Sequence, residues 1–263
     1  MVKVYSWSNI NSFHQAEIGE GCYYAYYLQY IKREKGIGNF FSELGSIVHD
    51  MLNKIHNEEI FEWDIENELI KRINNMEYEA PFPAKKSYID PIIQFFEDGI
   101  DVQFKDYVIL STEDKASIDL NGVKFFIKPD LMAEHEVKRL VVGDYKISKP
   151  YVGETLQHNI QQLYIYSEYM NQLYDMYPDY LVYWYLREPF SFREYFFEFN
   201  KKDLERTKYF ILSTIEKIEK QTEWKPKCEE VDGSKWFFAC QLCPFRNNCE
   251  YRYVFANKNA YEF

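Results

Sequence analysis

The stretch KPDLMAEHEVKRLVVGDYK, residues Lys128–Lys146, decides how the fold is read. Two apolar runs flank a polar turn at Glu134–Lys138, and this pattern predicts a β-hairpin. Asp130 and Asp144 lie in the two arms, although Asp is depleted in strands. A turn centred on Val137 would place Asp130 directly opposite Asp144 across the hairpin.

The three polar residues of the hairpin are expected on one face. Side chains alternate between the faces of a strand, so Lys146 projects from the same face as Asp144. Carboxylates whose Cβ atoms are about 5 Å apart repel each other, and either a shared proton or a bound cation relieves the repulsion. Oxygen ligands suit Mg²⁺ or Mn²⁺. Beside such an ion, Lys146 could orient or deprotonate a water or stabilise charge on a phosphate. Spacing alone also allows an exposed hairpin face with scattered charges.

The rest of the chain predicts an α/β fold of one domain. Its 263 residues, 46% of them hydrophobic, can bury a sizeable core. Helical spacing dominates about residues 1–105. The core of the fold, about 106–221, alternates strands and helices. Strands are expected at 107–120, 123–133, 139–148, 179–188 and 192–199, and helices at 153–173 and 201–221. The prediction is a mixed central β-sheet flanked by helices, with a helical N-terminal part and a Cys-rich lobe at about 222–263, joined to Cys22.

Composition narrows the partners and the compartment. A net charge of −11 argues against a nucleic-acid binder that uses its whole surface. Between Lys124 and Lys149, however, six Lys/Arg stand against four Asp/Glu, which suits a polyanionic substrate. No apolar run approaches the roughly 18 residues of a membrane span, and the first residues lack a signal-peptide pattern. We therefore expect a cytoplasmic protein with reduced cysteines and no membrane partner.

Three motifs resemble those of one known family. Pro129-Asp130 followed by Asp144-Tyr145-Lys146 resembles the signature of the PD-(D/E)XK nuclease superfamily, which has a restriction-endonuclease-like core. GSIVH at Gly45–His49 resembles the G-x-x-x-H motif of its RecB-like branch. QLYIY at Gln162–Tyr166 resembles the Q-x-x-x-Y motif of that branch. The motifs occur in the order that the family has.

The resemblance implies a role for each matching residue. It implies that the metal ligands are His49, Asp130, Asp144 and the backbone carbonyl of Tyr145. It implies that Lys146 assists the attacking water, and that Gln162 and Tyr166 hold a DNA phosphate or steady Lys146. Gln162 and Tyr166 share one helix face because they are four residues apart. Tyr166 can also be read as a core residue, and Gln161 competes with Gln162, although the residue four positions after Gln161 is Ile165.

The cysteines resemble a further feature of the family. CQLCPFRNNC, with Cys240, Cys243 and Cys249, is similar to the iron–sulfur subset that includes the AddB nuclease domain and the Cas-four nuclease of CRISPR adaptation. This resemblance implies a [4Fe–4S] cluster with Cys22 as the fourth ligand. Zn²⁺ is the rival, because four thiolates bind either. Cys228 could replace Cys22, and five unconnected buried cysteines remain the plain alternative.

The function expected from these motifs is metal-dependent hydrolysis of DNA. We expect an exonuclease that acts on single-stranded or frayed ends and uses Mg²⁺ or Mn²⁺, in DNA repair, phage replication or CRISPR adaptation. The alternative is an accessory protein that binds DNA ends for a separate helicase or CRISPR integrase, because the chain has no nucleotide-binding P-loop of its own. A zinc-stapled module with a degenerate hairpin is a third reading.

Overall fold

The computed structural model describes residues 4–79, 85–227, 240 and 242–251. The chain divides into two compact units. The first comprises Met1–Val4 and Phe40–Lys208, and the second comprises Tyr5–Asn39 and Tyr209–Phe263. The hairpin and the three family-like motifs all lie in the first unit, whereas Cys22 and the C-terminal cysteines lie in the second.

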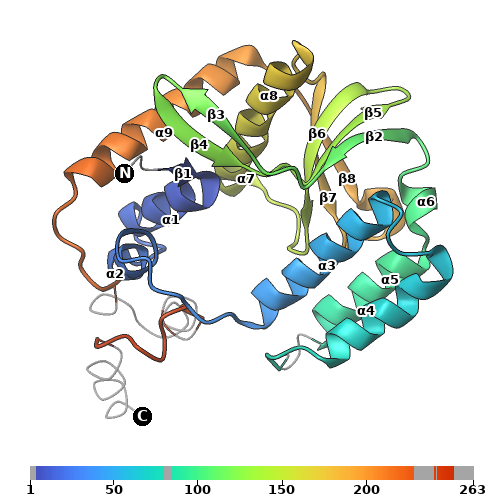
Figure 1. The fold of residues 1–263 in the computed structure, drawn as a ribbon, viewed down its shortest axis with the longest axis horizontal. Helices are drawn as coiled ribbons and strands as arrows, with labels where there is room; N and C mark the ends of the chain where they lie inside the picture. The colour runs from blue at the N-terminus through green and yellow to red at the C-terminus, as the bar shows by residue number, and fades with distance from the viewer. Residues whose placement is uncertain (1–3, 80–84, 228–239, 241, 252–263) are drawn as a thin grey trace. The chain divides into compact units, whose positions relative to one another are not determined.

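A five-stranded mixed sheet forms the centre of the first unit (Figure 1). Its strand order is β2-β5-β6-β7-β8, so β6 is the central strand. β6 and β7 run parallel, and the other neighbouring pairs are antiparallel. The strands are β2 (Tyr107–Thr112), β5 (Leu131–His135), β6 (Arg139–Lys146), β7 (Tyr180–Tyr185) and β8 (Glu194–Glu198). This is the mixed sheet that the sequence predicts.

The register of the β5–β6 hairpin is the predicted one. Leu131 pairs with Gly143 and His135 pairs with Arg139, which centres the turn on Val137. One part of the prediction is wrong: Asp130 is not in a strand but in a bend immediately before β5. The preceding Pro129 has no N–H to donate to a ladder, so pairing begins only at Leu131.

Two predicted strands are each split in two. The stretch 107–120 forms β2 and β3 (Ala116–Leu120), and 123–133 contains β4 (Val123–Ile127) and the start of β5. The first break contains Glu113, whose φ of 55° is incompatible with a continuous strand. β3 and β4 pair as a hairpin around Asn121-Gly122, which both have positive φ, as expected for an Asn-Gly turn.

Helices surround the sheet of the first unit (Figure 1). They are α3 (Phe40–His56), η2 (Glu62–Asp64), α4 (Ile65–Asn74), η3 (Lys85–Ile89), α5 (Asp90–Glu97), α6 (Ile100–Gln103), α7 (Gly153–Asn159), α8 (Gln161–Tyr174) and η4 (Phe190–Phe192). The predicted helix at 153–173 is interrupted at Ile160, between α7 and α8. No described helix has both the length and the apolarity to span a membrane.

The second unit is mainly helical where the structure describes it. It contains β1 (Tyr5–Ser6), α1 (Trp7–Glu17), α2 (Tyr23–Tyr26) and η1 (Tyr27–Ile31), and α9 (Lys201–Lys220) runs into it from the first unit. Ser6 caps α1 by accepting a hydrogen bond from the backbone N–H of Asn9, at 3.4 Å.

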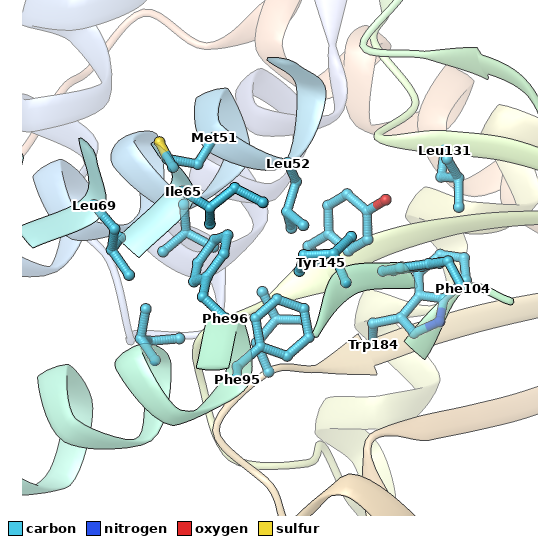
Figure 2. Close-up of a cluster of buried hydrophobic side chains, with 14 of the residues drawn as sticks. Met51, Leu52, Ile65, Leu69, Phe95, Phe96, Phe104, Leu131, Tyr145 and Trp184 are labelled. Atoms are coloured by element: carbon cyan, nitrogen blue, oxygen red, sulfur yellow. The ribbon is translucent and has the colours of Figure 1, made fainter. Parts of the chain in front are cut away.

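The buried core of the first unit packs against one face of the sheet. Figure 2 shows Met51, Leu52, Leu69, Phe95 and Phe96 from the helices packed beside Tyr145 and Trp184 from the sheet. On β6, Val141 and Tyr145 belong to this cluster. The intervening polar residue, Asp144, therefore points to the opposite face, together with Lys146. That opposite face is the one against which α8 packs.

Candidate functional site

Helix α3 brings His49 to the end of the sheet. Its apolar stripe, formed by Leu44, Val48, Met51 and Leu52, is fully buried. His49 lies at the edge of this stripe, as the spacing predicts, so its ring remains partly exposed. His49 Nδ1 lies 3.2 Å from Asp130 Oδ1 and 3.5 Å from Glu113 Oε1. The helix and the bend before β5, far apart in sequence, thus meet at one site.

Glu113 is a site residue that the sequence prediction missed. It follows β2, and its backbone N–H donates to the carbonyl oxygen of Pro129 at 3.0 Å. This hydrogen bond joins the segment after β2 to the segment before β5. The Glu113 carboxylate also pairs with Lys128. The signal that could have revealed it is the polar run Ser111–Lys115, which is a poor centre for a single strand.

His49, Glu113 and Asp130 form a candidate metal centre. One ligand atom from each lies within 4.8 Å of the others, and no other group of three His, Cys, Asp or Glu in the described parts of the chain meets this condition. Two carboxylates and an imidazole suit Mn²⁺ and, through the oxygens, Mg²⁺. The donor set therefore fits the divalent ion that the sequence predicts.

The electrostatics of this centre already favour a positive charge. Burial lowers the pKa of His49, but Asp130 and Glu113 outweigh it and raise that pKa to about 10. Burial raises the pKa of Asp130, but His49 outweighs it and holds that pKa below its ordinary value. The His49 proton thus sits between two carboxylates, and a divalent ion bound by all three groups would displace it.

Asp144 lies on the face of the sheet against which α8 packs, and its partners are Gln162 and Lys146. It is 2% exposed, and its Oδ1 accepts a hydrogen bond from Gln162 Nε2 at 2.9 Å. Its Oδ2 pairs with Lys146. Burial, followed by the charge of Asp130, raises the pKa of Asp144 to about 6. Asp144 is outside the three-residue group above, so its role as a metal ligand stays a prediction.

Gln162 connects Asp144, Lys146 and Tyr166. Its Oε1 accepts a hydrogen bond from Lys146 Nζ at 3.3 Å, and its Nε2 donates to the Tyr166 hydroxyl at 2.7 Å. The competing Gln161 has no such contact: its Oε1 is buried without a hydrogen-bond partner among the described residues. Tyr166 is only 6% exposed, so it is a core residue whose hydroxyl reaches the site. Hydrogen bonds of Gln162 therefore connect it to Asp144, Lys146 and Tyr166, and the roles of these residues stay predictions.

Tyr145 supports the site from the opposite face. Its backbone N–H donates to Asp130 Oδ2 at 2.8 Å, and its hydroxyl lies 3.0 Å from His56 Nε2. Its ring belongs to the buried cluster of Figure 2. Gly143 lets β6 lie close to β7, because a Cβ there would overlap Trp184 and Val182. The metal contact of the Tyr145 carbonyl stays a prediction.

The described cysteines of the second unit are Cys22, Cys240, Cys243 and Cys249, and no disulfide joins any two of these four. Burial, together with the charges of the nearby Cys22 and Cys249, raises the pKa of Cys243 to about 11. Backbone N–H groups of Lys227 and Phe245 donate to the sulfurs of Cys22 and Cys243, each at 3.4 Å. Cys228 lies outside the described residues.

The mixed sheet of the first unit has helices on both faces, as a restriction-endonuclease-like α/β core does, and its polar residues gather at one end of the central strand. The model of the PD-(D/E)XK nuclease superfamily matches residues 11–250. The chain belongs to this superfamily. No curated protein matches the chain.

Proposed function

We propose that the protein is a divalent-metal-dependent nuclease that hydrolyses phosphodiester bonds of DNA. The observation that carries the proposal is the meeting of His49, Glu113 and Asp130, from three separate segments, beside Asp144 and Lys146. Membership of the PD-(D/E)XK nuclease superfamily supports it. The proposed substrate is single-stranded DNA or a frayed end, and the proposed activity is that of an exonuclease, which removes nucleotides from an end.

The residues of the chain would divide the work as follows. His49, Glu113, Asp130 and Asp144 would hold Mg²⁺ or Mn²⁺, with the Tyr145 carbonyl as a further ligand. The bound ion would supply a Lewis acid and lower the pKa of a bound water. Lys146 would orient that water or stabilise the charge that develops on the phosphate. Gln162, braced by Tyr166, would keep Lys146 and Asp144 in place.

We further propose that Cys22, Cys240, Cys243 and Cys249 hold a [4Fe–4S] cluster. Three observations support this assignment. The thiols are buried or half-buried, Cys22 and Cys249 raise the pKa of Cys243, and backbone N–H groups donate to two of the sulfurs. Zn²⁺ is the rival occupant, because four thiolates bind either group. Reduced thiols also suit a cytoplasmic location.

A cleavage assay tests the nuclease. Single- and double-stranded oligonucleotides, labelled at either end, are incubated with Mn²⁺, Mg²⁺ or EDTA. The wild type should cut only with a divalent ion, and Lys146→Ala should lose at least about 100-fold in rate. Lys105→Ala, which removes an exposed lysine at the other end of the sheet, is the matched control.

The same assay separates the proposal from its rival. A circular single strand should resist an enzyme that needs an end. DNA that is bound but uncut under every metal condition would instead identify an accessory protein, acting for a separate helicase or CRISPR integrase. Equal cutting by wild type and Lys146→Ala would show that the proposed site does not perform the reaction.

A further inference from the structure

A groove lies beside the C-terminal end of α3, at the ends of α4 and α5. It encloses about 550 Å³. Its floor is apolar and is formed by Ile55, Ile60, Ile65, Phe96 and Ile100. Three of these side chains, Ile65, Phe96 and Ile100, are also part of the buried core of the unit. The groove is therefore an opening onto the core and not a hollow among loose surface chains.

Two exposed aromatic rings form the lip of this groove: Phe61 lines the groove, and Trp63 stacks on Phe61. Phe61 is 61% exposed and Trp63 is 73% exposed. The rings are stacked, with centroids 4.8 Å apart and an interplanar angle of 6°. An exposed apolar surface of this kind, continuous with an apolar groove, is typical of an interaction site. Aromatic residues, Trp above all, are the usual anchors of such sites.

The rim of the groove is acidic. Glu58, Glu66, Glu97 and Asp101 line it, and all four are exposed. None of them makes an ion pair with a Lys or Arg among the residues that the structure describes. The stretch Asn57–Ile70 contains six Asp/Glu and no Lys or Arg. The rim therefore carries uncompensated negative charge, which repels phosphate groups and attracts cations.

The backbone at Glu58 does not require a glutamate. Its φ is 58°, in the left-handed region directly after α3, where Gly or Asn is favoured. Glu is less favourable there, so this carboxylate adds charge to the rim at some cost to the turn. The position also offers a substitution that removes the charge without disturbing the fold.

We propose that this groove is a docking surface for a separate protein, which inserts a segment with apolar side chains flanked by Lys or Arg. The apolar floor and the aromatic lip would take the apolar residues, and the acidic rim would take the basic ones. A nucleic-acid strand does not suit this rim, because its phosphates would face the carboxylates. A second copy of the chain suits it less, because two copies that each carry a net charge of −11 repel each other.

A peptide-binding experiment tests the proposal without DNA and with EDTA present. Its outcome is thus independent of any nuclease activity. The probe is a dye-labelled helical peptide with leucines on one face and lysines elsewhere, compared with a peptide that has glutamates in place of the lysines. Fluorescence anisotropy should show micromolar binding of the basic peptide at low salt, weakened at high salt, and at least about tenfold weaker binding of the acidic peptide.

Variants locate the binding. Phe61→Ser/Trp63→Ser should weaken binding of the basic peptide at least about tenfold. Phe192→Ser is the matched control, because Phe192 is 63% exposed and lies in η4, outside the groove. Glu58→Asn/Glu66→Gln/Glu97→Gln should also weaken binding about tenfold, whereas Glu198→Gln, a single exposed carboxylate on β8, should change it less than about twofold.

Three outcomes would overturn the proposal. In the first, the basic peptide binds the Phe61/Trp63 variant as well as the wild type, and then its site lies elsewhere. In the second, sedimentation shows a dimer that the same variant dissociates, and then the groove is an interface between copies. In the third, a single-stranded oligonucleotide loses affinity for this variant but not for Phe192→Ser, and then the rings stack on bases.

Discussion

Glu113 Oε1 lies 3.5 Å from His49 Nδ1, on the side of the imidazole that also faces Asp130. A strand break and a helix thus contribute to one set of donors. The contact adds Glu113, as a candidate acidic ligand, to the residues that the family motifs suggest, and it gives the first prediction.

Glu113→Gln should weaken Mn²⁺ binding about 10- to 100-fold, because the substitution removes one negative charge from the donor set. Titration calorimetry of the DNA-free protein measures this. The neighbouring Asp114→Asn removes the same charge from a residue outside the three-residue group, so its Mn²⁺ affinity should stay within about threefold of the wild type. Equal losses in the two variants would exclude Glu113 as a ligand.

Gln162→Ala should lower the cleavage rate at saturating DNA about 10- to 100-fold, while Gln161→Ala should stay within about threefold. The reason is that Gln162 alone of the two holds both Lys146 and Asp144. A positioning role predicts a loss in kcat with little change in KM. Gln162→Glu, which keeps the acceptor for Lys146, should recover part of the rate. A pure loss of stability, with kcat unchanged, would contradict this role.

Gly143→Ala should destabilise the protein by about 3 kcal/mol. The added Cβ would overlap Trp184 and Val182, and the central strand cannot move away because both neighbours are paired to it. Urea unfolding followed by circular dichroism measures the change. An unfolding free energy within about 0.5 kcal/mol of the wild type would show that β6 and β7 have room to separate.

Gly45→Ala should have the opposite effect on stability. Gly45 lies in α3, and a Cβ there would meet only Ile147 at an ordinary 3.7 Å. Alanine should therefore stabilise the helix by about 1 kcal/mol. If Gly45 serves close approach of DNA, the same variant should bind single-stranded DNA more weakly despite its greater stability. Unchanged stability and unchanged DNA binding would together remove any reason for glycine at this position.

Cys22→Ser should lose the cluster, and Cys228→Ser should keep it. Cys22 lies near enough to Cys243 to raise its pKa and accepts a backbone hydrogen bond from Lys227. Iron and acid-labile sulfide per chain are measured after anaerobic purification. Loss of iron from Cys228→Ser alone would make Cys228 the fourth ligand, and a colourless wild type loaded with zinc would sink the iron–sulfur assignment.

Local pattern predicted the part of the site that lies within one hairpin. The register of β5 and β6, and the shared face of Asp144 and Lys146, follow from strand periodicity and a short turn. These are features of regular structure, in which spacing fixes direction.

The short segments that interrupt the predicted β-strands could not be predicted in the same way. Ser111–Lys115 and Lys128–Asp130 are short polar interruptions in β-rich sequence, and their geometry depends on a hydrogen bond between the two breaks. Glu113 was missed for this reason, and Asp130 was placed within a strand. The acidic groove could not be predicted from the sequence either. Its walls come from α3, α4, α5 and α6, and only tertiary packing brings these helices together.

The scattering of the site along the chain has a consequence for synthesis. His49 leaves the ribosome early, but Asp144 follows much later, and Gln162 and Tyr166 later still. A half-made chain therefore lacks Asp144, Lys146 and Gln162 of the proposed site. A chain cut anywhere between His49 and Tyr166 loses the complete site as well, provided that the pieces separate. The proposed site is thus complete only after Tyr166 has been synthesised and folding has brought these residues together.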